Sequence, residues 1–437
     1  MPSWLRQQSA GRSSVFNATA TGDDAGHQMK NIMHRLLDDP AFVPESIIFS
    51  TILLRSMDDF AAINATYRTF FTAPNPPARV TISCGEALPP GILVLVSVTA
   101  TNASLPKTAG LHVQSRSYWA PANIGPYSQA ITVPMHPSLP ADEQRSVRLT
   151  CVAGQIPLIP ATMELCSSEG NEQTVLSLQH LWRIGQVMDV DLWLGAVAFL
   201  SVSDNKPTHT RASIALDAWR LAHEPPEETL SDDEEDIVDV WDLKHGQYTG
   251  HSDQVGTTRR KEIQTDFVPP CFVVEVQALP RDADIEWSSL GVNSDGAQYG
   301  LQSMYTSITR MPSLVTAISQ AYPHSSHAMD PPNADIELDL ANATTTDPSH
   351  LTIWTKASLN NDATVIAGWL CFESFAQLEL FDPETLSERA SYTYTIYASA
   401  YLSPQHITGL NAQVIPCYSI WGLAAEPLVA LIAYRLA

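Results

Sequence analysis

The hydrophobic pattern of the first fifty residues switches between the period of a strand and the period of a helix. Residues 13–20 are rich in β-favouring side chains and end at a Thr-Gly-Asp-Asp turn, so we expect a short strand there. Apolar residues then recur at the i, i+3, i+4 and i+7 spacing of one helix face, at Met29, Ile32, Met33 and Leu36. Residues 47–54 form a near-continuous apolar run, which predicts a strand buried on both faces.

A second helix and two further strands complete this pattern. Ser56 stands in a capping position with Asp59 three residues later, and an apolar stripe follows at Phe60, Ile63, Tyr67 and Phe70. Apolar strand-like runs then cover residues 79–84 and 91–100. The order strand, helix, strand, helix, strand, strand predicts an α+β layer, in which two helices lie on one face of a sheet.

The same order returns in the middle of the chain. A strand is expected at residues 147–152. The glycine that follows it, Gly154, lets the backbone approach a ligand or a neighbour. The later expected elements are helices at 172–187 and 209–221, and strands at 192–202, 272–278 and 284–290.

An acidic insertion interrupts this second copy at residues 224–266. Its run EPPEETLSDDEEDIVDVWD holds ten acidic residues and neither Lys nor Arg, which is typical of a solvated loop. It is either a tolerated surface insertion or a regulatory segment, since Ser231 is followed by Asp-Asp-Glu and suits acid-directed phosphorylation.

The last part of the chain, residues 291–437, is less regular. A weak helical pattern covers residues 302–321, and strand-like runs follow at 335–340, 351–356, 367–372 and 392–402. The tail from Ile415 to Tyr434 has the outline of another closing strand pair. This region is long enough to hold a third, diverged copy.

Composition narrows the classes of function. With 44% apolar and 16% charged residues, the 437-residue chain should bury cores in two to three domains. Its net charge of −23 argues against nucleic acid or an anionic membrane as partner. The sequence has no apolar run of about 18 residues and no N-terminal apolar segment, so we expect neither a membrane span nor a signal peptide.

Candidate cofactor chemistry is sparse. The six cysteines are scattered without a Cys-x-x-Cys pair, which favours buried thiols and a cytoplasmic location. None of the thirteen histidines forms a close ligand pair with a carboxylate, so no metal is expected. Phosphate loops of the GxxxxGK[ST] or GxGxxG kind are also missing, so we expect no nucleotide site.

Two blocks in the middle of the chain carry a family resemblance. They are Ile-Gly-Pro-Tyr-Ser-Gln-Ala at residues 124–130 and Ala-Gly-Gln-Ile-Pro at residues 153–157, and together they resemble the opening hairpin of the RidA (YjgF) family of small trimeric proteins. The resemblance implies an α+β fold of tandem RidA/chorismate-mutase-like units, packed as an intrachain pseudo-trimer in a monomer. We place the units at residues 13–104, at 111–290 with the insertion 224–266, and at 291–437 as the diverged third.

The resemblance also implies a kind of site. RidA-type clefts lie between adjacent subunits, where an Arg holds the carboxylate of a small imino acid and a Tyr, a Ser and a Glu assist hydrolysis of the imine. Arg79 of the first unit matches the Arg, and Tyr127 and Glu286 of the second match the Tyr and the Glu. These three form the candidate composite cleft, and Gly154 and Gln155 are added as candidate ligand-binding residues.

No single unit holds the whole set. Leu95 stands in the first unit where the family has its Glu, and Ala153 replaces the Ser in the second. Cys271 in the second unit and Cys417 in the third, each after a proline, are assigned to the Arg position. Two interpretations stay open. Either one of the three clefts between the units is active, or none is active, in which case Arg79 forms a salt bridge and Tyr127 is an interface hydroxyl.

A longer phrase narrows the resemblance. Residues 112–129, with tandem diverged units around them, look like the C-terminal half of fungal diphthine–ammonia ligases, which complete diphthamide on elongation factor 2. Those ligases adenylate their substrate in an N-terminal ATP pyrophosphatase-type domain, whose Ser-Gly-Gly-x-Asp-Ser loop is missing here.

The resemblance therefore implies an accessory, non-catalytic region that needs no ATP of its own. Its expected partner is elongation factor 2 or the ATP pyrophosphatase domain. Two other functions stay open, a 2-imino acid deaminase with one composite site and a small-ligand-binding sensor.

Overall fold

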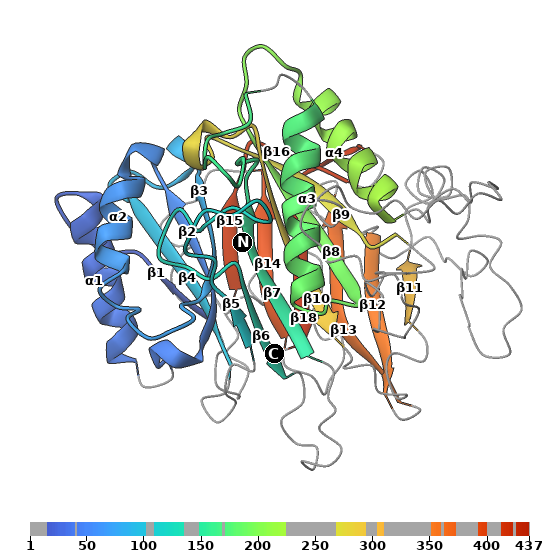
Figure 1. Cartoon of the computed structure of the whole chain (residues 1–437), viewed down its shortest axis with the longest axis horizontal. Helices are drawn as coiled ribbons and strands as arrows, with labels where there is room; N and C mark the ends of the chain where they lie inside the picture. The colour runs from blue at the N-terminus through green and yellow to red at the C-terminus, as the bar shows by residue number, and fades with distance from the viewer. Residues whose placement is uncertain are drawn as a thin grey trace, which may run out of the picture.

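The structure is a computed structural model that describes most of the first two predicted units and the strands of the third. The described residues are 15–39, 42–101, 109–134, 148–167, 171–223, 268–293, 304–309, 351–359, 362–372, 392–399, 412–422 and 425–436. They form three β-sheets, with helices on the first two (Figure 1). No helix within these ranges combines the length and the apolar character needed to cross a membrane.

The first sheet confirms the predicted order of elements. Its strands lie in the order β1-β4-β2-β3, with β2 and β3 parallel. The bounds are β1 Val15–Ala18, α1 Ala25–Asp38, β2 Ile47–Leu54, α2 Phe60–Tyr67, β3 Ala78–Ser83 and β4 Val94–Ala100. The second helix is shorter than expected, because Met57–Asp59 form a 3₁₀ turn whose N-cap is the Ser56 hydroxyl, which accepts a hydrogen bond from the Asp58 N–H.

The second sheet repeats this topology and extends it. Its run β9-β8-β10-β7 corresponds to β3-β2-β4-β1, and the hairpin strands β6 and β5 follow β7. The bounds are β5 Ala109–Leu111, β6 Ala130–Pro134, β7 Arg148–Gln155, α3 Asn171–Val187, β8 Leu192–Ser201, α4 Thr208–His223, β9 Cys271–Val276 and β10 Ile285–Asn293. Two short strands from the tail of the chain, β16 Ser419–Trp421 and β17 Pro427–Leu428, add to the free edge of β9.

The third sheet has the strand order of the second. Its sequence β15-β14-β18-β13-β12-β11 corresponds strand by strand to β9-β8-β10-β7-β6-β5, and β14 runs parallel to β15 as β8 does to β9. The bounds are β11 Met304–Thr309, β12 Leu351–Leu359, β13 Asp362–Phe372, β14 Tyr392–Ala398, β15 Ala412–Pro416 and β18 Ala430–Leu436. The pseudo-trimer packing and the unit boundaries stay predictions.

One predicted element is wrong. The weak helical pattern at residues 302–321 gives way to strand β11, which pairs antiparallel with β12. The segment Met-Tyr-Thr-Ser-Ile-Thr is rich in aromatic and β-branched side chains, which favour a strand once a partner strand is present. The predicted strand at 335–340 and the acidic insertion with Ser231 lie outside the described residues.

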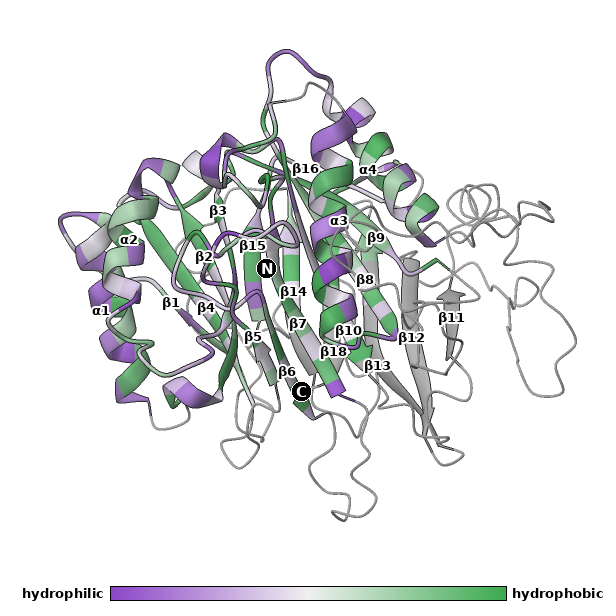
Figure 2. Cartoon of the chain, viewed as in Figure 1, coloured by the Kyte–Doolittle hydropathy of each residue, from purple (hydrophilic) through white to green (hydrophobic). Residues whose placement is uncertain are grey.

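Strands of the first two sheets bury both faces, as the continuous apolar runs predict. In β2, Ile52 and Leu54 pack in a core with α1 and α2, whereas Leu53 points to the other side of the sheet. In β8, Ala198 packs in the core that α3 and α4 cover, and Phe199 points the other way. The outward residues meet residues of the third sheet, such as Ile396, in one core that all three sheets share. Hydrophobic residues accordingly run along strands β2, β4 and β8 in Figure 2.

Candidate functional site

The predicted composite cleft lies where the first sheet meets the second. Side chains alternate along β3, so that Arg79 and Thr81 face this cleft and Val80 faces the opposite side. The lining residues are Phe60, Arg79, Thr81, Ile124, Tyr127, Gly154, Ile156, Pro280 and Glu286. A volume of about 20 Å³ is open to the centres of water-sized spheres, which is room for a water molecule.

Backbone contacts between the two sheets fix this geometry. Ala78 of β3 forms a parallel bridge with Ser128, and the Ser128 N–H donates to the Pro77 carbonyl at 3.3 Å. At the other end of β3, the Ser83 N–H donates to the Ala278 carbonyl at 2.9 Å. The segment that carries Tyr127 is thereby held beside Arg79.

Arg79 is a buried cation inside an aromatic cage. Its side chain is 3% exposed, and its Cζ lies 5.8 Å from the ring centre of Phe60, 5.1 Å from Tyr67 and 5.0 Å from Tyr127. Neither Nη1 nor Nη2 has a hydrogen-bond partner among the described residues. Burial lowers the pKa of Arg79, but an arginine stays protonated in proteins. The cage offers π-faces to the charge and leaves both terminal nitrogens free to donate.

Glu286 forms the opposite wall. It is 3% exposed, and its Oε2 has no hydrogen-bond partner in the described part of the chain. Burial raises the pKa of Glu286 to about 8, although the charge of Arg79 acts to lower it. Burial therefore disfavours the ionised carboxylate, and among the described residues neither terminal nitrogen of Arg79 is bonded to it.

Gly154 makes room for this carboxyl group. A β-carbon at residue 154 would overlap Oε1 of Glu286, so the acid packs directly on the backbone of β7. This confirms the prediction that Gly154 allows a close approach, and it identifies the neighbour as Glu286. Gln155, in contrast, does not line the cleft, because its side-chain amide donates to the Ala153 carbonyl at 2.9 Å.

More polar atoms around the cleft are buried without partners. Among the described residues, Asn64 Oδ1, Thr81 Oγ1 and Ser128 Oγ make no hydrogen bond. Unsatisfied buried polar atoms are costly, so their gathering here points to a water or a ligand as the missing partner. Sequence reasoning missed Asn64 and assigned Tyr67 to a helix core. The polar Asn64 beside Ile63 in the helical stripe was the available signal.

The strand registers test the assignments of lost site residues. Leu95 pairs with Leu53 as Glu286 pairs with Phe199, so Leu95 does occupy the Glu position of the first sheet. Cys271 lies opposite Ala196 as Arg79 lies opposite Ser50, which confirms its place at the Arg position.

The assignment of Cys417 is wrong. Its N–H donates to the Ala398 carbonyl at 3.0 Å, as the Cys84 N–H donates to Leu54 at 2.8 Å, so Cys417 corresponds to Cys84. Five residues earlier, Ala412 takes the position of Arg79. The shared Pro-Cys dipeptide misplaced the match. Among the described residues, only the junction of the first and second sheets joins an Arg and a Glu at these positions.

Replacing Gly154 by alanine tests the close approach. The new β-carbon must displace the Glu286 carboxyl, and we expect urea unfolding to show a loss of about 1–3 kcal/mol. Gly26→Ala in helix α1 is the control, since its β-carbon would lie 3.3 Å from the exposed Asp24 side chain and causes no core collision. In a Glu286→Ala background the penalty of Gly154→Ala should vanish. An equal penalty in both backgrounds would show that Glu286 is not the group in contact.

Comparisons with known proteins agree with this architecture. Residues 12–102 match the family described as Endoribonuclease L-PSP. The diphthine–ammonia ligase of Schizosaccharomyces pombe is 29% identical over 279 residues, which cover 64% of this chain and 36% of that protein. The diphthine–ammonia ligase of Saccharomyces cerevisiae is 36% identical over 144 residues, which cover 31% of this chain and 20% of that protein.

The chain thus contains a RidA-like region related to fungal diphthine–ammonia ligases, and this confirms the resemblance found in the sequence. It spans only about a third and a fifth of the length of these two relatives. Among solved structures, the YjgF gene product of E. coli is similar with a TM-score of 0.22 and 20% identity, over 40% of this chain and 95% of that one.

Proposed function

We propose that this chain acts as the RidA-like region of a diphthine–ammonia ligase system and that its composite cleft binds a small ligand carrying a carboxylate. One observation carries the proposal. The guanidinium of Arg79 is buried at the junction of two sheets with both terminal nitrogens unpartnered among the described residues.

A carboxylate is the group that this cleft lacks. Burying an unpaired charge is costly, and Glu286 is not bonded to either terminal nitrogen of Arg79, while burial disfavours its ionised form. The two oxygens of a ligand carboxylate match the two Nη groups of an arginine in a bidentate pair. The open volume of about 20 Å³ holds one water molecule, so a carboxylate ligand such as pyruvate enters only when the wall formed by the Tyr127 segment moves outward.

In this proposal, ATP activation belongs to the ATP pyrophosphatase domain of the ligase system. The present chain contributes the ligand cleft and contacts either that domain or elongation factor 2 in the cytoplasm. The similarity to two diphthine–ammonia ligases supports this assignment, and the acidic charge of −23 favours a basic surface on the partner.

A cellular experiment tests both halves of the proposal. Elongation factor 2 is isolated from cells of the source organism that carry the wild-type gene, a deletion, Arg79→Met or Arg35→Gln, and its diphthamide content is measured by mass spectrometry. Deletion and Arg79→Met should both lower diphthamide in favour of the unamidated precursor. The exposed Arg35, which bonds the Thr19 carbonyl, is the control and should have no effect.

The outcomes separate the two halves. Full modification in the deletion strain would overturn the ligase assignment. Normal modification in Arg79→Met, with loss in the deletion, would keep the assignment and overturn the role of the cleft in it.

A second candidate function, 2-imino acid deamination, is favoured by Glu286. A carboxyl group with a pKa of about 8 can exchange a proton near neutral pH, beside a clamp for the substrate carboxylate. Water would add to the imine carbon, and loss of ammonia would leave a 2-oxo acid. Imino acids made by an amino-acid oxidase are trapped by semicarbazide. Wild-type protein should lower semicarbazone formation, and Glu286→Gln should not. If the wild-type protein has no effect on semicarbazone formation, the deaminase function is excluded, and the proposal of carboxylate binding is unaffected.

A further inference from the structure

A second cavity lies where all three sheets meet, separate from the Arg79 cleft. Val80 of β3 faces this cavity, and its neighbours Arg79 and Thr81 face the cleft. About 110 Å³ is open to the centres of water-sized spheres. We propose that this central cavity binds a small, neutral, largely apolar molecule that carries one hydrogen-bonding group.

The walls select against charge. The described residues that line the cavity include no charged side chain and are dominated by aromatic and aliphatic groups from all three sheets, among them Phe49, Leu194, Phe199, Trp369 and Ile415. An ionic ligand would lose its hydration here without gaining a counter-ion. Apolar cavities of similar size, roughly 150 Å³, hold benzene-sized molecules, which sets the size class of the ligand.

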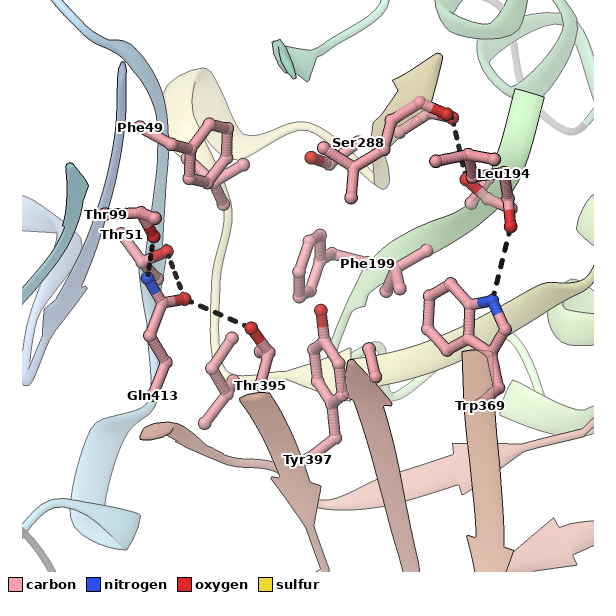
Figure 3. A pocket seen from close by; sticks show the side chains of 18 of the residues that line it. Phe49, Thr51, Thr99, Leu194, Phe199, Ser288, Trp369, Thr395, Tyr397 and Gln413 are labelled. Carbon is pink, nitrogen blue, oxygen red and sulfur yellow. Dashed lines mark hydrogen bonds between the residues drawn. The ribbon is translucent and has the colours of Figure 1, made fainter. Parts of the chain in front are cut away.

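Most polar side chains on the wall already have hydrogen-bond partners within the protein. The amide of Gln413 accepts from Thr51 Oγ1 at 3.1 Å and Thr395 Oγ1 at 3.4 Å, and donates to Thr99 Oγ1 at 3.4 Å (Figure 3). Ser289 Oγ donates to the Gly195 carbonyl at 2.7 Å. These groups are therefore occupied, and they add little to ligand recognition.

The hydroxyl of Tyr397 is different. Tyr397 is 7% exposed, its ring packs 6.3 Å from that of Phe199, and its hydroxyl points into the cavity (Figure 3). It has no hydrogen-bond partner among the described residues, and burial raises its pKa, so the hydroxyl keeps its proton. This one free group can donate to or accept from a ligand, and it defines the single polar contact.

Because the central cavity lies between all three sheets, a ligand bound there should stabilise the folded protein. Gln413 of the third sheet bonds Thr51 and Thr99 of the first, and Phe199 of the second faces the same space. A ligand held there contacts all three sheets and none of its contacts survive in the unfolded chain. Binding should therefore raise the melting temperature by mass action.

Calorimetry and thermal shift with phenol test the proposal. Phenol should bind the wild-type protein and raise its melting temperature, and Tyr397→Phe should weaken phenol binding about 3- to 10-fold by removing one hydrogen bond. Toluene, which has no hydroxyl, should bind both proteins equally. Tyr418→Phe is the matched control, because that hydroxyl bonds Gln277 on the surface at 2.6 Å, and phenol affinity should not change.

Two results would overturn the proposal: no phenol binding to the wild-type protein, or equal phenol affinity in wild type and Tyr397→Phe. The proposal would also be overturned if Arg79→Met abolished phenol binding and Tyr397→Phe left it unchanged, since this result would place phenol in the Arg79 cleft. Benzoate should not bind the Arg79→Met protein, because the central cavity excludes a charge. Circular dichroism should show that Tyr397→Phe folds normally, as the lost hydroxyl has no partner among the described residues.

Discussion

The wild-type protein is expected to lose stability between mildly acidic and mildly alkaline pH, and replacing Glu286 by glutamine should abolish most of this loss. The folded pKa of Glu286 is raised from 4.5 to about 8, so the folded state binds more protons than the unfolded chain in this range. The stabilisation is complete below pH 4.5 and is lost as the pH rises through about 8. At about 1.4 kcal/mol per pKa unit, the full loss is of the order of 5 kcal/mol.

The measurement is urea unfolding of both proteins at pH 5, 7 and 9, compared as a difference. Other titrating groups, such as the buried His180 and His223, contribute to both proteins and cancel. Glu86→Gln is the control, since the Glu86 side chain is 82% exposed and pairs with Arg55 at the surface. If Glu286→Gln and the wild type lose stability in parallel as the pH rises, Glu286 is ionised in the folded protein.

Exchanging Arg79 for methionine should cost little stability or even increase it, although Arg79 is almost fully buried. The change removes a buried charge without hydrogen-bond partners among the described residues and replaces it by an apolar chain of similar length. Even a complete buried ion pair can often be replaced by apolar residues at no cost or with a gain of about 1–4 kcal/mol, so removal of an unpaired charge should cost little. The lost contacts with three aromatic rings, each worth about 0.5–1 kcal/mol, act in the opposite direction.

Arg55→Met provides the contrast. Arg55 donates to the carbonyls of Ile92, Leu88 and Pro89 and also bonds Glu86. Its loss leaves carbonyl groups unsatisfied, and we expect a destabilisation of about 3 kcal/mol in urea unfolding. If Arg79→Met were destabilised as much as Arg55→Met, Arg79 would be a structural residue. This result would contradict the proposal that Arg79 binds a ligand.

The composite cleft could be predicted because its parts keep local sequence patterns. Tyr127 stands in the Gly-Pro-Tyr-Ser block and Gly154 in the Ala-Gly-Gln block, and each carries its signal within a few residues. Arg79 and Glu286 follow from the repeated order of strands, since each occupies a fixed place on a closing strand. What the sequence left open was their contact across two sheets.

Other features could not be read in this way. Cys417 and Cys271 both follow a proline, which suggests equivalent positions. The hydrogen-bond register shows that their positions along equivalent strands differ by five residues. Strand β11 depends on pairing with β12, which lies more than forty residues later. The central cavity is built from ordinary strand residues such as Thr51, Tyr397 and Gln413, which are far apart in the chain and carry no motif.

Calorimetric titration with pyruvate is the most direct test of the account, which rests on the Arg79–Glu286 cleft as a carboxylate site. The wild-type protein should bind one pyruvate per chain, because the described residues join an Arg and a Glu in one cleft. Arg79→Met should bind at least about 100-fold more weakly, as two charge-assisted hydrogen bonds are lost. Equal pyruvate binding by both proteins, or none by the wild type, would contradict it.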